Sequence, residues 1–132
     1  MPQEFDTGAY RDGQDGKYDY EGFLSPLVLE RFARYMHENR RQSNGELRDS
    51  DNWQLGVPLD SYMKSGFRHF MDWWGLHRGK VIRTLDIEEA LCGVLFNAMG
   101  YLHEHMKQEA ERKMHLDDIV ADEIVFPDNW KD

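Results

Sequence analysis

Apolar residues recur at helical spacing over residues 84–115, and this period constrains the fold more than any other feature of the sequence. Positions three, four and seven residues apart share one face of an α-helix. The pattern therefore predicts a long helix that starts near Thr84 to Asp86, ends at about His115 and has polar last turns. The apolar stripe consists of Ile87, Leu91, Val94, Leu95, Ala98, Leu102 and Met106.

Two further helices are expected before it. Ser25 followed by Pro26 is a helix start, with serine as the N-cap and proline at the first helical position, and the helix is expected to run to about Gln42. The next helix is expected to begin near Pro58 or Asp60. Their apolar stripes are Leu29, Phe32, Tyr35 and Met36 in the first, and Leu59, Tyr62, Met63, Phe67, Phe70, Trp73 and Trp74 in the second.

The length of 132 residues is typical of one domain. Residues 1–24 are rich in glycine, aspartate and tyrosine without a helical period, which indicates an arm before a helical core at 25–115. Residues 116–132 are expected to form a tail with a short β-like run, Ile124 to Phe126. The predicted fold is therefore all-α: a compact helical bundle of three to four helices with an irregular N-terminal arm and a short C-terminal tail.

Charge and cysteine content exclude several classes of function. A net charge of −9 argues against a nucleic-acid partner, because phosphate backbones require a basic surface. Cys92 is the one cysteine, so no intrachain disulfide can form, which fits a reducing compartment. Because no apolar run approaches the length of a membrane span and the N-terminus does not resemble a signal peptide, we expect a cytoplasmic protein without a membrane partner.

A histidine and a carboxylate share a face of the second helix. His69 and Asp72 are three residues apart, so both side chains can reach one divalent ion. An ordinary explanation is also open, in which His69 lies at the edge of the core and Arg68 pairs with Asp72 one turn away.

The third helix opens with a cluster of carboxylates. Asp86, Glu88 and Glu89 lie within one turn, where acidic groups favour the positive end of the helix dipole and Asp86 can act as a cap. Glu89 also lines up with Gly93 and Asn97 along one stripe. An amide in such an apolar run needs a hydrogen-bond partner. That partner is either another helix or a ligand.

Three other positions can take part in a binding site. Glu38, near the end of the first helix, is a possible further ligand, although a solvated helix end explains it equally well. Asn52 and Trp53 offer an amide and a stacking face of the kind that bases use, or Trp53 anchors its loop to the core. Arg11 and Lys17 lie among glycines and can reach phosphates.

Three segments together resemble the phage and prophage dATP/dGTP diphosphohydrolase N-terminal domain family over residues 5–107. They are FDTGAYRDGQDGKYDYEGFLSPLVLERFARYM, RDSDNWQLGVPLDSYMKSGFRHFMDWW and DIEEALCGVLFNAMGYLHE. The resemblance extends to the MazG-like pyrophosphohydrolases. It implies a helical bundle in a homo-oligomer, dimeric or higher, in a bacterial or phage-infected cell, and hydrolysis of a deoxynucleoside triphosphate with Mg²⁺ or Mn²⁺.

The chain departs from that pattern in its acidic motifs. MazG-like enzymes carry ExxE on one helix and ExxD on the next, whereas the nearest equivalents here are His69 to Asp72 and Asp86 to Glu89. When the chains are matched on VLFN, Gly93 lies where the family has a metal-binding aspartate. Either a rearranged set of ligands holds the metal, or this chain has lost catalysis.

The expected function is metal-dependent hydrolysis of a purine deoxynucleoside triphosphate, with Glu89 and Glu38 as catalytic groups. The metal ligands are expected to be His69, Asp72, Glu89 and Asp86. The substrate-binding residues are expected to be Arg11, Lys17, Asn52, Trp53, Arg68 and Asn97. The alternative is a non-catalytic accessory, assembly or nucleotide-binding module, whose polar helix residues only join one helix to another.

Overall fold

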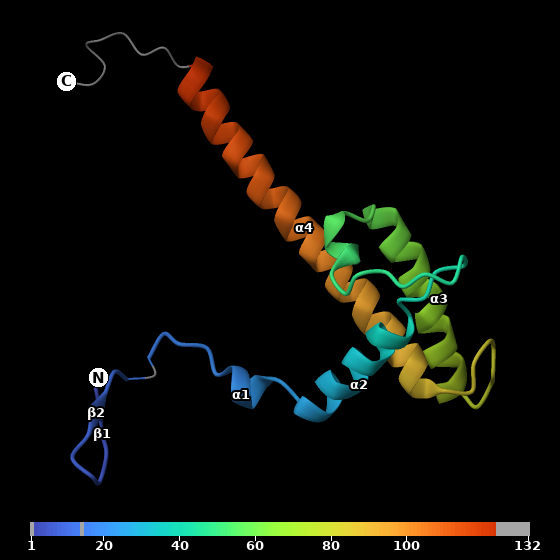
Figure 1. The fold of residues 1–132 in the computed structure, drawn as a ribbon, viewed down its shortest axis with the longest axis horizontal. Helices are drawn as coiled ribbons and strands as arrows, with labels where there is room; N and C mark the ends of the chain where they lie inside the picture. The colour runs from blue at the N-terminus through green and yellow to red at the C-terminus, as the bar shows by residue number, and fades with distance from the viewer. Residues whose placement is uncertain (1, 14, 124–132) are drawn as a thin grey trace. The chain divides into compact units, whose positions relative to one another are not determined.

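Residues 2–13 and 15–123 are described by the structure, a computed structural model. Within them four α-helices carry most of the chain, and each strand is two residues long, which confirms the all-α class. The predicted β-like run at Ile124 to Phe126 lies outside the described residues. The elements are β1 (Gln3–Glu4), β2 (Tyr10–Arg11), α1 (Tyr20–Phe23), α2 (Pro26–Glu38), the 3₁₀ helix η1 (Asn52–Leu55), α3 (Leu59–His77) and α4 (Ile87–Glu123) (Figure 1).

Internal contacts divide the chain into two units, Met1–Arg34 and Tyr35–Asp132, with the boundary inside α2. In the first unit, β1 and β2 pair antiparallel around a turn at Gly8, whose φ of 86° favours glycine. The predicted start of α2 is confirmed, because the Ser25 hydroxyl accepts the Val28 N–H at 3.2 Å.

The second unit begins with the last turn of α2, which ends at Glu38 and not at Gln42 as predicted. The Tyr35 carbonyl accepts both the backbone N–H of Asn39, at 3.1 Å, and its side-chain amide, at 2.8 Å. The chain then turns through Gly45, whose φ is 87°, and Arg41 and Leu47 form an antiparallel bridge. This turn replaces the predicted last helical residues because asparagine and glycine favour turns over helix interiors.

The main packing of the second unit is between α3 and α4. Helix α3 begins directly after Pro58, as predicted. Glycines permit the close approach: Gly100 leaves room for the ring of Tyr62, and a Cβ at Gly66 would lie 3.3 Å from the Cβ of Asn97. The buried apolar side chains of the described residues are few, namely Tyr35, Tyr62, Ala90 and Cys92.

Helix α4 has 37 residues and reaches Glu123, so the prediction of an end at His115 was wrong. Residues 116–123, predicted as the start of the tail, continue the helix. The polar turns before them contain good helix formers, and Arg112 pairs with Glu109 at 3.0 Å on the helix surface. None of the helices in the described part of the chain is long and apolar enough to cross a membrane.

Candidate functional site

The packing of α3 on α4 brings His69 and Glu89 to the same side of the helix pair. The imidazole ring of His69 lies directly against Gly93, one turn after Glu89 on α4. The ring fills the space that a side chain at position 93 would need. The stripe of Glu89, Gly93 and Asn97 predicted from spacing therefore does face the predicted histidine.

Asp72 is paired with Arg83, a residue that the sequence analysis did not single out. Both carboxylate oxygens of Asp72 accept hydrogen bonds from the guanidinium of Arg83, at 3.0 and 2.9 Å. Asp72 is 4% exposed, whereas the side chain of Arg83 is 45% exposed. Asp72, expected as a metal ligand or, alternatively, as the partner of Arg68, thus forms a bidentate pair with the connector between α3 and α4. Such two-pronged bonds are short and strong because both groups are charged.

The surroundings of His69 favour the neutral ring. Its pKa is lowered from 6.5, first by burial and then by the positive charge of Arg83. Arg68 lowers this pKa further, whereas the carboxylates of Asp72 and Glu89 oppose the shift. A neutral imidazole can accept a proton or a hydrogen bond at pH 7.

Helix α2 contributes a tyrosine to the same cluster. The pKa of the buried Tyr35 is raised from 10.0 by burial, and secondly by the negative charge of Glu89. Glu38, the expected contribution of α2, is the last residue of the helix and is exposed. We refer below to Tyr35, His69, Asp72, Arg83 and Glu89 as the seam cluster.

Two of the expected site residues make local hydrogen bonds. Asp86 is the N-cap of α4: one of its carboxylate oxygens accepts the backbone N–H groups of Glu88 and Glu89, at 2.9 and 3.3 Å. Asn97 is 5% exposed and donates to the Gly93 carbonyl one turn back at 2.7 Å. The amide thus finds this partner within its own helix and not on another helix.

The other expected binding residues fall into three places. Arg68 is exposed on α3 and acts on the pKa of His69. Asn52 and Trp53 are in η1, and Trp53 makes edge contacts with Phe96 and His103 on α4, with ring centroids 6.1 and 4.9 Å apart. Trp53 therefore does anchor its loop. Arg11, at the end of β2, and Lys17 are exposed residues of the first unit.

A polar pocket of about 220 Å³ lies between the end of α2, the following loop, η1 and α4. Asn52 and Trp53 line it, as does Tyr35 of the seam cluster. Arg40 and Arg48 line it too, although sequence reasoning did not select them. Their convergence depends on the turn at 41–47, for which the sequence offers only its asparagine and glycine as a signal.

The expected metal ligands do not form a metal site in the described residues. Over residues 2–13 and 15–123, no three His, Cys, Asp or Glu side chains are arranged to hold one ion. Both oxygens of Asp72 are bonded to Arg83, and an oxygen of Asp86 is bonded to backbone N–H groups. Mg²⁺ and Mn²⁺ prefer several oxygen ligands. Among the described residues, the expected ligands therefore form no cage of three protein side chains around one ion.

Comparison with family models, curated proteins and solved structures finds no match to this chain.

Proposed function

We propose that this chain hydrolyses a purine deoxynucleoside triphosphate to the monophosphate and pyrophosphate at the seam cluster. One observation carries the proposal: the His69 ring lies against Gly93, one turn after Glu89 on α4, where the charge of Glu89 acts on the pKa of His69 and of Tyr35. Three helices thus place a half-buried carboxylate beside a phenol and a neutral imidazole. The resemblance of residues 5–107 to the diphosphohydrolase family supplies the substrate.

Residues of the seam cluster can take different roles in this hydrolysis. Glu89 orients a water molecule and accepts its proton as the water oxygen attacks the α-phosphorus. The bond from that phosphorus to the bridging oxygen breaks, and pyrophosphate leaves with the electron pair. Arg83 of the cluster and Arg68, outside it on α3, offer positive charge to the phosphates, which stabilises the charge that develops in the transition state. Among the described residues the cluster forms no cage of three protein ligands, so the roles above are assigned to the chain's own side chains.

The test is release of pyrophosphate from each of the four deoxynucleoside triphosphates, with Mg²⁺, with Mn²⁺ and with EDTA. We expect release from the purine nucleotides, and loss of at least a hundredfold in rate for Glu89→Gln. The matched control is Glu88→Gln, which removes the same charge from the exposed neighbouring position and should keep the rate. Absence of release from folded protein under all three conditions would refute the proposal.

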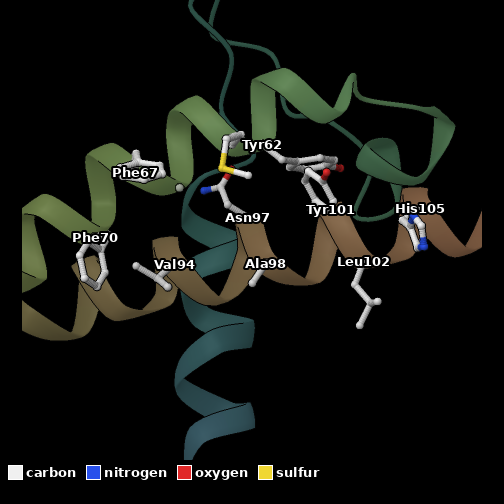
Figure 2. Close-up of a pocket in the computed structure, with 11 residues that line it drawn as sticks. Tyr62, Phe67, Phe70, Val94, Asn97, Ala98, Tyr101, Leu102 and His105 are labelled. Atoms are coloured by element: carbon white, nitrogen blue, oxygen red, sulfur yellow. The ribbon is translucent and has the colours of Figure 1, made fainter.

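A second candidate, a non-catalytic assembly module, is favoured by an apolar groove along α3 and α4. The groove has a volume of about 730 Å³ and is lined by Tyr62, Met63, Gly66, Phe67, Phe70, Val94, Asn97, Ala98, Tyr101, Leu102 and His105. Figure 2 shows Phe70 reaching from α3 toward Val94 of α4. Phe67 and Leu102 are 61% and 57% exposed. Contiguous apolar surface of this kind is typical of an interaction site.

A further inference from the structure

The polar pocket described above combines two arginines with aromatic rings. Arg40 comes from the residues just after α2, and Arg48 from the loop before η1. The backbone N–H of Arg48 donates to the Arg40 carbonyl at 2.9 Å, so the two residues are held side by side. Ligand pockets for small molecules usually exceed about 300 Å³. At about 220 Å³, this pocket can enclose only part of such a ligand.

The rim of the pocket is positively charged. The guanidinium of Arg40 is steadied by His37, with Nη2 3.2 Å from the ring Nδ1 and Nε 3.4 Å from the carbonyl oxygen. Arg48 is exposed, and its guanidinium donates no hydrogen bond to any of residues 2–13 and 15–123. Asp49 is the acidic residue of the lining. Two arginines against one carboxylate leave a net positive charge on a protein whose total charge is −9.

The inner part of the pocket is aromatic. Tyr35 is buried, and Trp53 and Phe96 are partly buried. The ring of Trp53 is fixed by edge contacts with Phe96 and His103, and its lining of the pocket offers a surface on which a planar ring can stack. The amide of Asn52 lies beside it and can bond the edge of such a ring.

The pocket adjoins the seam cluster through one shared residue. Tyr35 lines the pocket, and the charge of Glu89 acts on its pKa. A ligand that fills the pocket therefore contacts Tyr35, a residue of the seam cluster.

We propose that the polar pocket binds a nucleoside phosphate, with its base against Trp53 and its phosphate bonded to Arg40 and Arg48. The proposal rests on the proposed function for the class of ligand, and it adds the two arginines that hold the phosphate. Arginine recognises phosphate oxygens with two parallel N–H bonds, so the exposed guanidinium of Arg48 and the remaining N–H groups of Arg40 match that ligand.

The experiment measures binding without turnover, by calorimetry in EDTA. The probes are dGMP, deoxyguanosine and inorganic pyrophosphate, and the protein is the full chain. We expect dGMP to bind more tightly than either fragment. Arg48→Gln should weaken dGMP binding about tenfold, the loss typical of one charge-assisted contact, and should leave deoxyguanosine unchanged. The control is Arg112→Gln, which removes a positive charge from an exposed position on α4 and should leave dGMP binding unchanged.

Three outcomes would overturn the proposal: no binding of dGMP to folded protein, equal weakening by Arg48→Gln and Arg112→Gln, or equal affinity for dGMP and pyrophosphate. The results also distinguish a failure of the pocket proposal from a failure of the hydrolase proposal. If dGMP binding depends on Arg48 but no nucleotide is hydrolysed, the pocket proposal is supported and the proposed catalysis at Glu89 is refuted. If hydrolysis depends on Glu89 but Arg48→Gln does not change dGMP binding, the hydrolase is supported and the pocket proposal is refuted.

Discussion

The ring of His69 occupies the space that a side chain at position 93 would need, so the histidine at position 69 requires a glycine at position 93. A Cβ built at position 93 collides with three atoms of the imidazole ring. The glycine admits the histidine ring from the neighbouring helix, where any larger side chain would exclude it.

Replacing Gly93 with alanine should displace the His69 ring and lower stability. Overpacking of a tight contact costs about 1–3 kcal/mol. Alanine is a better helix former than glycine by about 1 kcal/mol, which offsets part of that cost. We therefore expect the free energy of unfolding, measured in urea, to fall by about 1 kcal/mol in Gly93→Ala.

A double variant distinguishes this collision from a general effect on α4. His69→Ala removes the ring, so adding Gly93→Ala to it should cost nothing and should even stabilise the helix. The two substitutions should therefore couple by about 0.5–3 kcal/mol, the range measured for residues in contact. Additive effects would contradict the packing of His69 on Gly93.

The pair of Asp72 and Arg83 should contribute more to stability than the other arginine pairs at the surface. Arg83→Gln leaves the buried Asp72 carboxylate without its two charge-assisted bonds. Because Arg83 is partly exposed, solvent offsets part of the loss, and we expect the free energy of unfolding to fall by about 1–3 kcal/mol.

The exposed pair of Arg112 and Glu109 is a matched control. It has nearly the same separation as the pair of Arg83 and Asp72, 3.0 against 2.9 Å, but neither partner is buried. Arg112→Gln should change the urea midpoint little or not at all, because water and salt screen exposed pairs. Equal effects of the two substitutions would show that Asp72 does not depend on Arg83.

Stability should fall as the pH is lowered through 6.5, because of His69. The folded-state pKa of this histidine lies below 6.5, so the unfolded chain binds more protons between the two values. The free energy of unfolding therefore rises with pH across that window and is independent of this group above it. The charges around the ring come from Arg83, Asp72, Arg68 and Glu89.

Chemical denaturation between pH 5 and 7.5 tests this effect. His69→Gln should flatten the pH dependence relative to the wild type. His77→Gln replaces an exposed histidine at the end of the same helix and should keep the slope of the wild type. An unchanged slope in His69→Gln would place the source of the pH dependence elsewhere.

The sequence predicts the helices correctly where apolar residues recur at helical spacing. It predicts two helix ends wrongly, where the residues are polar. The starts of α2, α3 and α4 lie at the predicted positions, because proline and cap residues act locally. Two helix ends differ from the prediction: α2 ends at Glu38 and not at Gln42, and α4 continues past His115. At both predicted ends the residues are polar, so the apolar period gives no signal there.

The candidate site could be predicted only in part, for a related reason. Spacing along one helix was enough to place His69 with Asp72, and Glu89 with Gly93. The pairing of Asp72 with Arg83 joins residues eleven positions apart, through a connector with no regular period. Likewise, Arg40 and Arg48 meet because a turn folds back between them. Contacts of this kind depend on tertiary structure, which periodicity does not report.

The apolar groove of α3 and α4 should make the chain associate with itself. Its exposed Phe67 and Leu102 leave apolar surface in water, and the described residues bury few apolar side chains, so pairing two such helix pairs would give a larger core. We expect light scattering after gel filtration to show a dimer or a larger assembly for the wild type.

The double variant Phe67→Ser with Leu102→Ser should shift this assembly toward the monomer, while the α-helical circular dichroism persists. Leu55→Ser, at a leucine that is even more exposed but lies outside the groove, should leave the assembly intact. A wild type that is monomeric at all concentrations would show that the groove does not join copies of this chain.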